Sequence, residues 1–298
     1  MTWKQIGLST YIASGLGLTG LVGTLLTMSA PGTAGYDPAP DARPPVISTD
    51  STGGRAYEPP ADSRAPTGPT DTSGGRTCGV SQNGLQMTPL APQQHVGQTL
   101  SAHPTFTWFV PVSSALEGEF QIYELTETGP RRVFDTPYQF TSSQGFMTLT
   151  LPSEGGGLKA DTDYVWQVLL RCSSRPGDIY KVRAQMAVVE AAERSPADLA
   201  DLPLEQAAQL GQAGLWYDTL AAVSATPISP EAIAFRRTLL TELADLEADA
   251  EASPDPESGV VPHSEALRQI AATDSSTANL QPEQMLPNTP DGSDTEDP

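Results

Sequence analysis

The chain has 298 residues and a mass of 31.4 kDa, which is enough for one or two domains. Its 16 Lys and Arg stand against 36 Asp and Glu, a net charge of −20. This balance leaves no basic patch for a phosphate backbone and argues against nucleic-acid binding. With 28 Pro, 26 Gly and only 6% aromatic residues, we expect the folded part to be much shorter than the chain. Three His and two Cys limit metal and redox chemistry.

Residues 1–34 have the pattern of an export signal. Lys4 is their only charged residue, an uncharged stretch runs from Ile6 to Met28, and small residues end at Ala34. A signal peptidase reads such small residues, so we expect cleavage after Ala34 and export to the periplasm or outside the cell. The alternative is an uncleaved membrane anchor, because the apolar stretch approaches the roughly 20 residues that a spanning helix needs.

Two long segments have the composition of disordered chain. Residues 35–77 contain 24 Pro, Gly, Ser and Thr among 43 positions, and residues 253–298 contain seven Pro and carry a net charge of −8. Such segments bury too little apolar surface to offset the entropy lost on ordering. We expect a disordered linker over 35–77 and a disordered acidic tail over 253–298, with at most a transient helical turn from His263 to Ala272.

Residues 78–190 are expected to form an antiparallel β-sandwich. Short apolar or alternating segments recur there between turn-forming stretches, with no helical pattern between them, as in sandwich folds. The alternation is clearest from Tyr164 to Cys172, where every second residue shares one face. The expected strands are Leu85–Leu90, Thr105–Val110, Glu119–Thr126, Arg132–Tyr138, Phe146–Leu151, Tyr164–Cys172 and Ile179–Val188.

The run from Leu158 to Tyr164 resembles the start of a late strand in fibronectin type III domains. In that immunoglobulin-like architecture, the tyrosine hydroxyl bonds to backbone at a corner of the sheet. The resemblance implies the same bond for Tyr164 and favours a sandwich of the fibronectin type III or immunoglobulin type.

The two cysteines, Cys78 and Cys172, lie at the start of the expected sandwich and at the end of its most hydrophobic strand. An even pair in an exported chain is usually a disulfide. Closing a loop this long would stabilise the fold by roughly 4–5 kcal/mol in the chain-entropy model. A redox-active pair is the alternative, but such cysteines are normally separated by only two residues, so we expect a structural disulfide.

Residues 191–252 are expected to be helical and to pack on the sandwich. Ser229-Pro230 combines an N-cap serine with a first-turn proline, and apolar residues from Phe235 to Leu246 recur at helical spacing. The earlier stretch around Gly214–Leu220 resembles one tetratricopeptide-like helix–turn–helix unit.

Trp216 and Tyr217 stand at the centre of the densest apolar cluster outside the expected sandwich. We expect both to anchor the helices on the sheet. The alternative is a peptide-binding site in which Trp216 and Tyr217 contact a partner.

Several separated motifs occur in a fixed order along the chain. They lie in Gly75–Cys78, Leu85–Pro92, Gly97–Pro111, Tyr164–Cys172 and Gln212–Leu220. Together they resemble domain of unknown function 928, a family known from cyanobacteria. The resemblance covers about residues 75–250 and departs from the family around Val182–Glu190. It implies an exported protein with a β part and a helical part, and it transfers no catalytic residues.

No motif for catalysis is evident. His95 and His103 have no cysteine or third histidine close enough to complete a zinc site, so we expect both in loops. Two pairs of carboxylates could act as acid and base across a sugar, although solvated carboxylates are the default in so acidic a chain. We expect no enzyme activity, no metal and no cofactor. The two pairs are Asp161 with Asp163 and Glu124 with Glu127.

Two classes of function remain for such a chain. The first is a non-catalytic protein-binding or assembly module of the cell envelope with a protein partner. The alternative is a glycan-binding or glycan-processing module, which needs two or three aromatic side chains exposed on one surface. The candidate aromatics are Trp108, Phe109, Tyr123, Tyr138 and Phe140.

Overall fold

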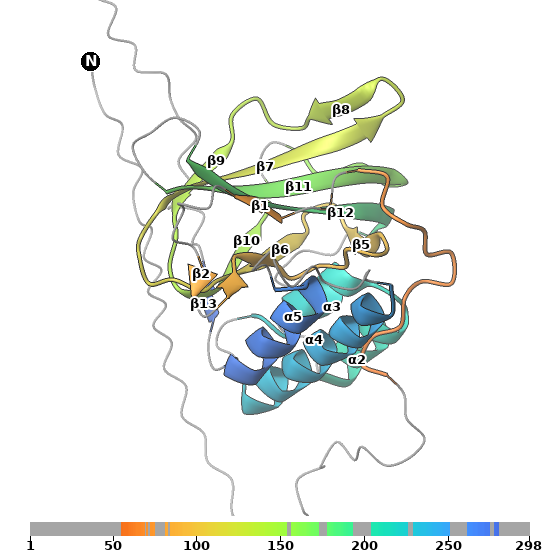
Figure 1. The fold of residues 1–298 in the computed structure, drawn as a ribbon. Helices are drawn as coiled ribbons and strands as arrows, with labels where there is room; N and C mark the ends of the chain where they lie inside the picture. The colour runs from red at the N-terminus through yellow and green to blue at the C-terminus, as the bar shows by residue number, and fades with distance from the viewer. Residues whose placement is uncertain are drawn as a thin grey trace, which may run out of the picture. The chain divides into compact units, whose positions relative to one another are not determined.

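The structure is a computed structural model in which the chain divides into two units, residues 1–51 and 52–298. All the described residues belong to the second unit, so the expected export signal lies outside them. The described residues are 55–68, 70, 72–74, 81–82, 84–153, 156–172, 178–192, 204–225, 229–250, 261–274 and 277–279. Within them the fold is of the α+β class, with three layers (Figure 1).

The first layer is a large sheet whose central strands are β12 (Ile179–Ala192), β11 (Thr162–Arg171) and β7 (Glu117–Thr126). Neighbouring strands of this trio run antiparallel. The two outer strands of this trio, β12 and β7, each pair with two short strands on the side away from β11. Beside β12 lie β1 (Thr72–Gly74) and the parallel β5 (Gly97–Ser101), and beside β7 lie β8 (Gly129–Arg132) and β9 (Tyr138–Thr141).

The second layer is a small sheet in the order β13 (Thr277–Asn279), β10 (Gly145–Thr150), β6 (Thr105–Val110) and β4 (Thr88–Pro89). Only the β13–β10 pair is parallel; the others are antiparallel. A separate short pair joins β2 (Ser81–Gln82) to β3 (Leu85–Gln86).

The main core lies between the two sheets. The ring of Phe106 on β6 packs against Phe120 on β7 at 4.8 Å and against Trp166 on β11 at 5.4 Å. Trp108, two residues further along β6, faces the same way and stacks 6.5 Å from Phe120. All four aromatic side chains are fully buried, so the two sheets pack face to face.

The opposite face of the small sheet is also covered. Phe109 and Phe146 contact each other edge to face at 5.5 Å, and the guanidinium of Arg236 lies 4.3 Å from the centre of the Phe146 ring. Because the small sheet is buried on both faces, β6 places apolar residues on both of its faces from Trp108 to Val110 instead of alternating along its whole length.

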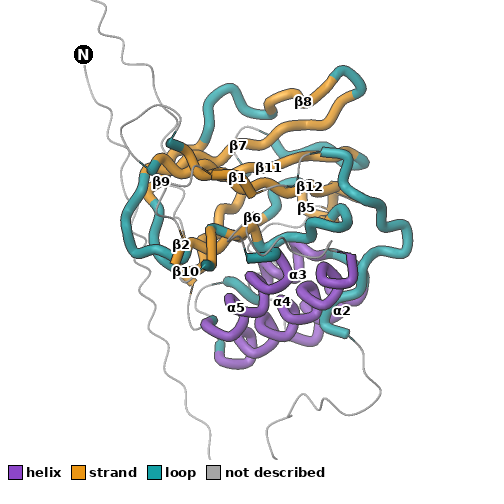
Figure 2. The backbone as a smooth tube through the Cα atoms, viewed as in Figure 1, coloured by secondary structure: helices purple, strands orange, loops and turns teal. Residues whose placement is uncertain are grey.

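The third layer consists of helices α2 (Leu204–Gln212), α3 (Trp216–Ala222), α4 (Pro230–Ala250) and α5 (His263–Thr273). Helix α3 packs against β5 and β6, while α5 packs against α4, β3 and β4. The tube drawing in Figure 2 shows these helices gathered beside the small sheet. No helix among the described residues is long and apolar enough to span a membrane.

Two local predictions are confirmed by hydrogen bonds. The Tyr164 hydroxyl accepts a bond of 2.9 Å from the backbone N–H of Lys159, which is the expected corner bond. The Ser229 hydroxyl accepts a bond of 3.1 Å from the Ala232 N–H, which caps the start of α4 as expected.

The prediction of one strand over Arg132–Tyr138 is wrong. This stretch ends β8, crosses a loop and begins β9, and the two strands pair with different halves of β7. Pro137 lies in that loop and has no N–H to donate to a ladder. Strand β5 was also missed, because Gly97–Ser101 has little hydrophobicity of its own.

The prediction of a disordered tail from residue 253 is corrected at two places. Helix α5 buries Leu267 and Ile270 completely, and β13 adds to the edge of the small sheet. The fully buried Arg236 of α4 pairs with Asp274, which follows α5, and its Nε lies 2.7 Å from the carboxylate. A charged pair inside the core holds this segment, and net charge alone does not reveal it.

The prediction of a disordered linker over 35–77 is corrected at residues 55–68, which we call the strap. In Figure 1 the strap is the orange loop that runs from the helices to the large sheet. Tyr57 is completely buried, and the N–H groups of Thr67 and Gly68 donate to the Gln185 side-chain oxygen at 2.8 and 2.7 Å. Bonds to distant side chains order this segment.

Candidate functional site

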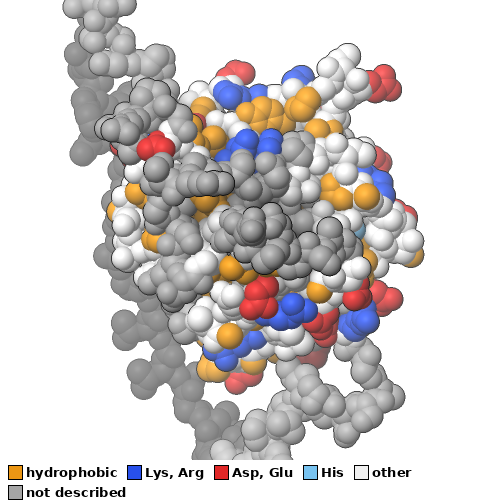
Figure 3. Space-filling model, viewed as in Figure 1, with side chains coloured by type: hydrophobic (Ala, Val, Ile, Leu, Met, Phe, Trp, Pro, Cys, Tyr) orange, Lys and Arg blue, Asp and Glu red, His pale blue; other side chains and the backbone are white. Residues whose placement is uncertain are grey.

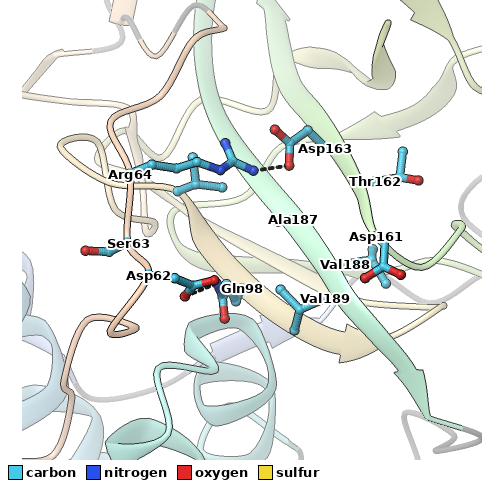
Figure 4. Close-up of a pocket in the computed structure, with 11 residues that line it drawn as sticks. Asp62, Ser63, Arg64, Gln98, Asp161, Thr162, Asp163, Ala187, Val188 and Val189 are labelled. Carbon is cyan, nitrogen blue, oxygen red and sulfur yellow. Dashed lines mark hydrogen bonds and ion pairs between the residues drawn. The ribbon is translucent and has the colours of Figure 1, made fainter.

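A pocket of about 210 Å³ opens where the strap crosses the large sheet. One wall is formed by Asp62, Ser63 and Arg64 of the strap, and the others by β5, the start of β11 and the end of β12 (Figure 4). Ala187 and Val188 supply apolar surface. The pocket therefore combines an apolar part with polar side chains from segments far apart in the chain.

The polar side chains of the pocket bond mainly to one another. Asp163 pairs with Arg64 and accepts a bond of 3.2 Å from the Gln185 amide. Asp62 accepts a bond of 3.3 Å from the Gln98 amide. These contacts fix the side chains in place, which suits recognition of a ligand.

The structure brings the predicted pair Asp161 and Asp163 into this pocket. Asp161 adopts φ 51° at the turn before β11, a left-handed conformation that aspartate tolerates better than most residues. Asp163 is held by Arg64, whose approach from the strap no local pattern predicted. The two carboxylates thus lie in a site with a fixed cation.

The other predicted pair does not converge on a pocket. Glu124 forms ion pairs with Arg131 and Lys159, and Glu127 is exposed at the turn between β7 and β8. These contacts tie the end of the large sheet together.

The strap is anchored next to this pocket by one buried side chain. The Tyr57 hydroxyl lies 2.7 Å from His95 Nε2, and its ring meets Trp216 edge to face at 4.9 Å. The Tyr57 N–H also donates to the Glu242 carboxylate at 2.8 Å. Strap, loop and two helices therefore meet at Tyr57.

Burial controls the ionisation of this anchor. Burial lowers the pKa of His95 to about 4, and burial, followed by the electrostatic effects of Tyr217 and then Glu247, raises the pKa of Tyr57. Both groups are neutral over a wide range of pH. The loop that carries His95 is held by α4, because the Gln93 N–H donates to the Glu247 carboxylate at 2.8 Å.

Two glycines let the strap backbone approach the helices. A Cβ at Gly211 would lie 2.0 Å from the Ala56 carbonyl oxygen, and the Gly211 carbonyl accepts a 3.1 Å bond from the Glu58 N–H. Gly214 has φ +80°, and a Cβ there would lie 2.7 Å from the Pro60 ring. Together with His95, Trp216 and Glu242, these glycines form what we call the strap site.

Trp216 and Tyr217, the predicted anchors, are both buried. The Trp216 Nε1 donates to the Leu90 carbonyl at 2.9 Å, and the Tyr217 hydroxyl accepts a bond of 2.8 Å from Trp166. They connect α3 to the sheets. Trp216 contacts Tyr57 of the strap. The peptide segment that Trp216 contacts in this structure therefore belongs to the same chain.

The five candidate aromatics do not form one exposed platform. Trp108, Phe109 and Phe140 are buried. Tyr138 packs against Phe120 on the inner face of the large sheet, whereas Tyr123, three residues after Phe120, belongs to the outer face. These side chains give the glycan hypothesis no shared surface.

The structure describes His95, His103 and Cys172 of the residues considered for metal or redox chemistry. His95 and His103 both lie in loops, as predicted, and the described part of the chain holds no cluster of three metal-binding side chains. Cys172 follows β11 directly, but Cys78 lies outside the described residues. The Cys78–Cys172 disulfide therefore stays a prediction.

Sequence reasoning missed the strap site and, apart from Asp161 and Asp163, the lining of the pocket. Only one local signal pointed to them, namely Tyr57 as a large side chain within a Pro-rich stretch. Arg64 and Asp163 are 99 residues apart, so their pairing has no local signature.

A family model described as Domain of Unknown Function (DUF928) matches residues 71–252. The match spans more than half of the chain and includes β1 to β12 and helices α2 to α4. The strap, α5 and β13 lie outside it. A comparison with curated proteins finds no match.

Proposed function

The chain belongs to the DUF928 family, and we propose that it is a non-catalytic protein-binding or assembly module of the cell envelope. The observation that carries this proposal is the way the folded body holds the strap. A stretch of chain without helix or strand is bound through backbone hydrogen bonds and one inserted tyrosine, and folded domains bind peptides through the same combination of main-chain bonds and side-chain pockets.

The pocket beside the strap is the proposed docking point for a partner. It presents three carboxylates, from Asp62, Asp161 and Asp163, against the one guanidinium of Arg64. This excess of negative charge favours a partner that inserts a lysine or arginine side chain. The bonds of Asp62 and Asp163 to their neighbours support recognition over proton transfer.

The visible face of the molecule favours binding at a specific pocket over binding through a broad apolar surface. On the face drawn in Figure 3, acidic and basic side chains of the described residues lie interspersed, and the hydrophobic side chains seen between them form small separate patches. A large apolar patch would indicate a general docking face, so the proposal centres on the pocket.

The sequence supports the proposed setting in the cell envelope. The pattern of residues 1–34 supports export, and the described residues contain no free cysteine thiol, which is compatible with a Cys78–Cys172 disulfide in an oxidising compartment. The corner bond of Tyr164 supports a fibronectin type III-like sandwich. The pair of short helices α2 and α3 supports a tetratricopeptide-like unit, and the family resemblance supports a cyanobacterial source.

A quantitative affinity capture from envelope extract tests the proposal. The wild-type chain is compared with Asp161→Asn, which removes a pocket charge and keeps a residue that tolerates left-handed φ. The matched control is Asp135→Asn, an exposed aspartate between β8 and β9. We expect one protein to be retained by wild type and control and reduced at least about tenfold by Asp161→Asn, a loss of about 1.4 kcal/mol.

Two outcomes contradict the proposal. If no protein is enriched over a bait-free matrix, the chain is not a protein-binding module under these conditions. If Asp161→Asn retains the same partner as wild type, binding occurs elsewhere and the pocket is not the docking point.

A further inference from the structure

The anchor of the strap is a contact between two side chains that are closed off from water. The Tyr57 hydroxyl lies 2.7 Å from His95 Nε2, and the two rings stack with their centres 5.7 Å apart. Tyr57 is fully buried and His95 is 8% exposed. A hydrogen bond is strong in such surroundings, and the loss of either partner is costly. The protonation state of His95 therefore matters for the strap.

His95 fits this place in its neutral form. A neutral imidazole can accept a hydrogen bond from the tyrosine hydroxyl at one ring nitrogen, whereas an imidazolium carries a proton on both nitrogens and accepts none. Burial also disfavours the charged ring and lowers the pKa of His95 to about 4. Both effects oppose protonation while Tyr57 is in place.

The titratable groups around the anchor do not offset a positive charge on His95. Glu242 of α4 accepts the Tyr57 N–H, and Glu247 of α4 accepts N–H groups of the loop before His95. Tyr217 of α3 also faces the anchor, and burial raises its pKa, so that it stays neutral. Among the described residues no carboxylate forms an ion pair with His95, and burial, not a neighbouring charge, shifts its pKa. A protonated His95 would thus be a buried charge without a counter-ion.

The middle of the strap, residues 61–65, is exposed throughout. Asp62 accepts a bond of 3.3 Å from the Gln98 amide. Arg64 pairs with Asp163, and its carbonyl accepts a backbone N–H just before β5. Exposed ion pairs add little stability, and a segment with few buried contacts opens locally while the rest stays folded. Release of the anchor therefore lets this part of the strap leave the body.

The far end of the strap stays attached when the anchor is released. The N–H groups of Thr67 and Gly68 donate to the Gln185 side chain at 2.8 and 2.7 Å, and β1 pairs with β12 further along the chain. These bonds lie on the large sheet and involve no histidine. The opened strap is therefore a tethered flap whose hinge lies at residues 67–68.

The strap forms one wall of the pocket that is the proposed docking point. Asp62, Ser63 and Arg64 line this wall, and in Figure 4 they lie on the strap, across from Asp161. The strap also brings the Arg64 guanidinium to Asp163. Opening of the strap removes the wall and separates the Asp163 carboxylate from this cation. The complete pocket therefore belongs to the closed strap.

We propose that His95 is a pH-sensitive latch: protonation of its imidazole releases Tyr57, the strap moves away from the body, and the pocket loses one wall. The proposal rests on the proposed function, because it names the regulation of the same docking pocket. The pocket binds its partner near neutral pH and releases it in acid.

The direction of the effect follows from the state in which His95 binds a proton more readily. In the closed strap the pKa of His95 is about 4, and in the open strap the exposed ring regains an ordinary value near 6.5. Falling pH therefore favours the open form progressively between these two values. From pH 7 to pH 5 the ratio of open to closed strap should rise roughly twentyfold. Carboxyl groups with ordinary pKa values near 4 stay largely ionised over this interval.

Amide hydrogen exchange of the whole chain at pH 7 and pH 5 tests the proposal. The N–H groups of Tyr57 and Glu58 are bonded to the helices, so their exchange, corrected for its intrinsic pH dependence, reports opening of the strap. We expect the opening constant of both amides to rise about twentyfold from pH 7 to pH 5. The amides of residues 67–68, beyond the released part, should change little.

Variants of His95 supply the critical comparison. His95→Gln and His95→Leu carry no titratable side chain, one polar and one apolar, and both should show the same opening constant at pH 7 and pH 5. His103→Gln, the same change beyond the other end of β5, is the matched control and should keep the rise of the wild type. Because each readout is a ratio between two pH values, a variant with a looser strap still distinguishes the two cases.

Two results would overturn the latch. The first is a wild-type opening constant that differs by less than about threefold between the two pH values. The second is a rise in the His95 variants equal to that of the wild type, which would assign the effect to other groups.

Affinity capture at the same two pH values links the latch to the pocket. The partner that depends on Asp161 should be retained by wild type at pH 7 and lost at pH 5, and His95→Gln should retain it at both. Capture that is independent of pH despite an opening strap would overturn the regulation and leave the proposed function in place. Strap opening in a chain that captures no partner would refute the proposed function and leave the latch in place.

Discussion

The strap and helix α5 both come from segments whose composition predicts disorder, yet they join the fold by different means. Helix α5 buries one face, with Leu267 and Ile270 completely covered. The strap buries Tyr57 completely, while Asp62 and Arg64 stay exposed. Helix α5 is held by a continuous buried face, whereas the strap is held by one buried ring and by separate hydrogen bonds to the body.

This difference separates two ways of recruiting a polar segment to a core. The backbone of the α5 segment is hydrogen-bonded within the helix, so this segment needs only a complementary surface for its apolar face. The strap has no internal ladder, so its backbone depends on Glu242, Gln185 and Gly211 of the body. We therefore expect α5 to contribute more to stability than the strap does.

Truncation should produce the largest effect. A chain that ends at Ala250 loses α5 and leaves Arg236 buried without Asp274, so we expect it to fail to fold or to melt far below wild type. A chain that ends at Asn279 keeps both, and it should melt like wild type because only the acidic end is removed. Calorimetry on the two truncated chains measures the contrast, and equal melting would show that α5 is dispensable.

Breaking the buried ion pair alone should have the second-largest effect on stability. Arg236→Ala leaves the Asp274 carboxylate without its cation inside the core, which typically costs about 3–5 kcal/mol. The control is Arg268→Ala at the exposed pair with Asp245, which should cost less than about 1 kcal/mol. Urea unfolding of both variants gives the two values; similar values would contradict the role of burial.

Replacing Tyr57, the buried anchor of the strap, should lower the free energy of unfolding by a comparable amount. Two different substitutions separate the contribution of the ring from that of the hydroxyl. Tyr57→Ala removes a fully buried ring from between His95 and Trp216, and we expect the free energy of unfolding to fall by about 3–5 kcal/mol. Tyr57→Phe keeps the ring and loses only the bond to His95, for about 1 kcal/mol. A Tyr57→Ala chain as stable as wild type would show that the strap is not anchored here.

Acidification should weaken the strap before it weakens α5. His95 has an ordinary pKa near 6.5 when unfolded and about 4 when folded, so the unfolded chain binds its proton more readily between these values. The stability due to neutral His95 is complete above pH 6.5 and is lost as pH falls towards 4, about 3 kcal/mol in all. His95→Gln removes this dependence, and the difference between the two unfolding curves from pH 7 to pH 4 measures it; parallel curves would contradict it.

The smallest effect should come from the edge of the pocket. Arg64 is half exposed and pairs with Asp163 at the surface, so Arg64→Ala should cost at most about 1 kcal/mol, and less at high salt. Denaturation at two ionic strengths measures this change. A loss of several kcal/mol would mean that the strap is held by its ion pair and not by Tyr57.

Local signals in the sequence determined part of this protein correctly. The apolar run of β6 predicted its bounds, Ser229-Pro230 predicted the start of α4, and Tyr164 predicted its own corner bond. Each signal acts over a few residues, through side-chain periodicity or a nearby backbone group. The family membership over 71–252 followed from motifs of the same kind.

The tertiary structure alone decided how distant segments meet. Asp161 and Asp163 could be paired by their spacing, but their site became a pocket only when Asp62 and Arg64 arrived from the strap. The sequence predicts that Asp274 belongs to a solvated acidic tail. In the structure Asp274 is buried and pairs with Arg236 in the core. Such contacts leave no periodic trace in either segment, because burial and charge pairing depend on what the rest of the chain brings to the same place.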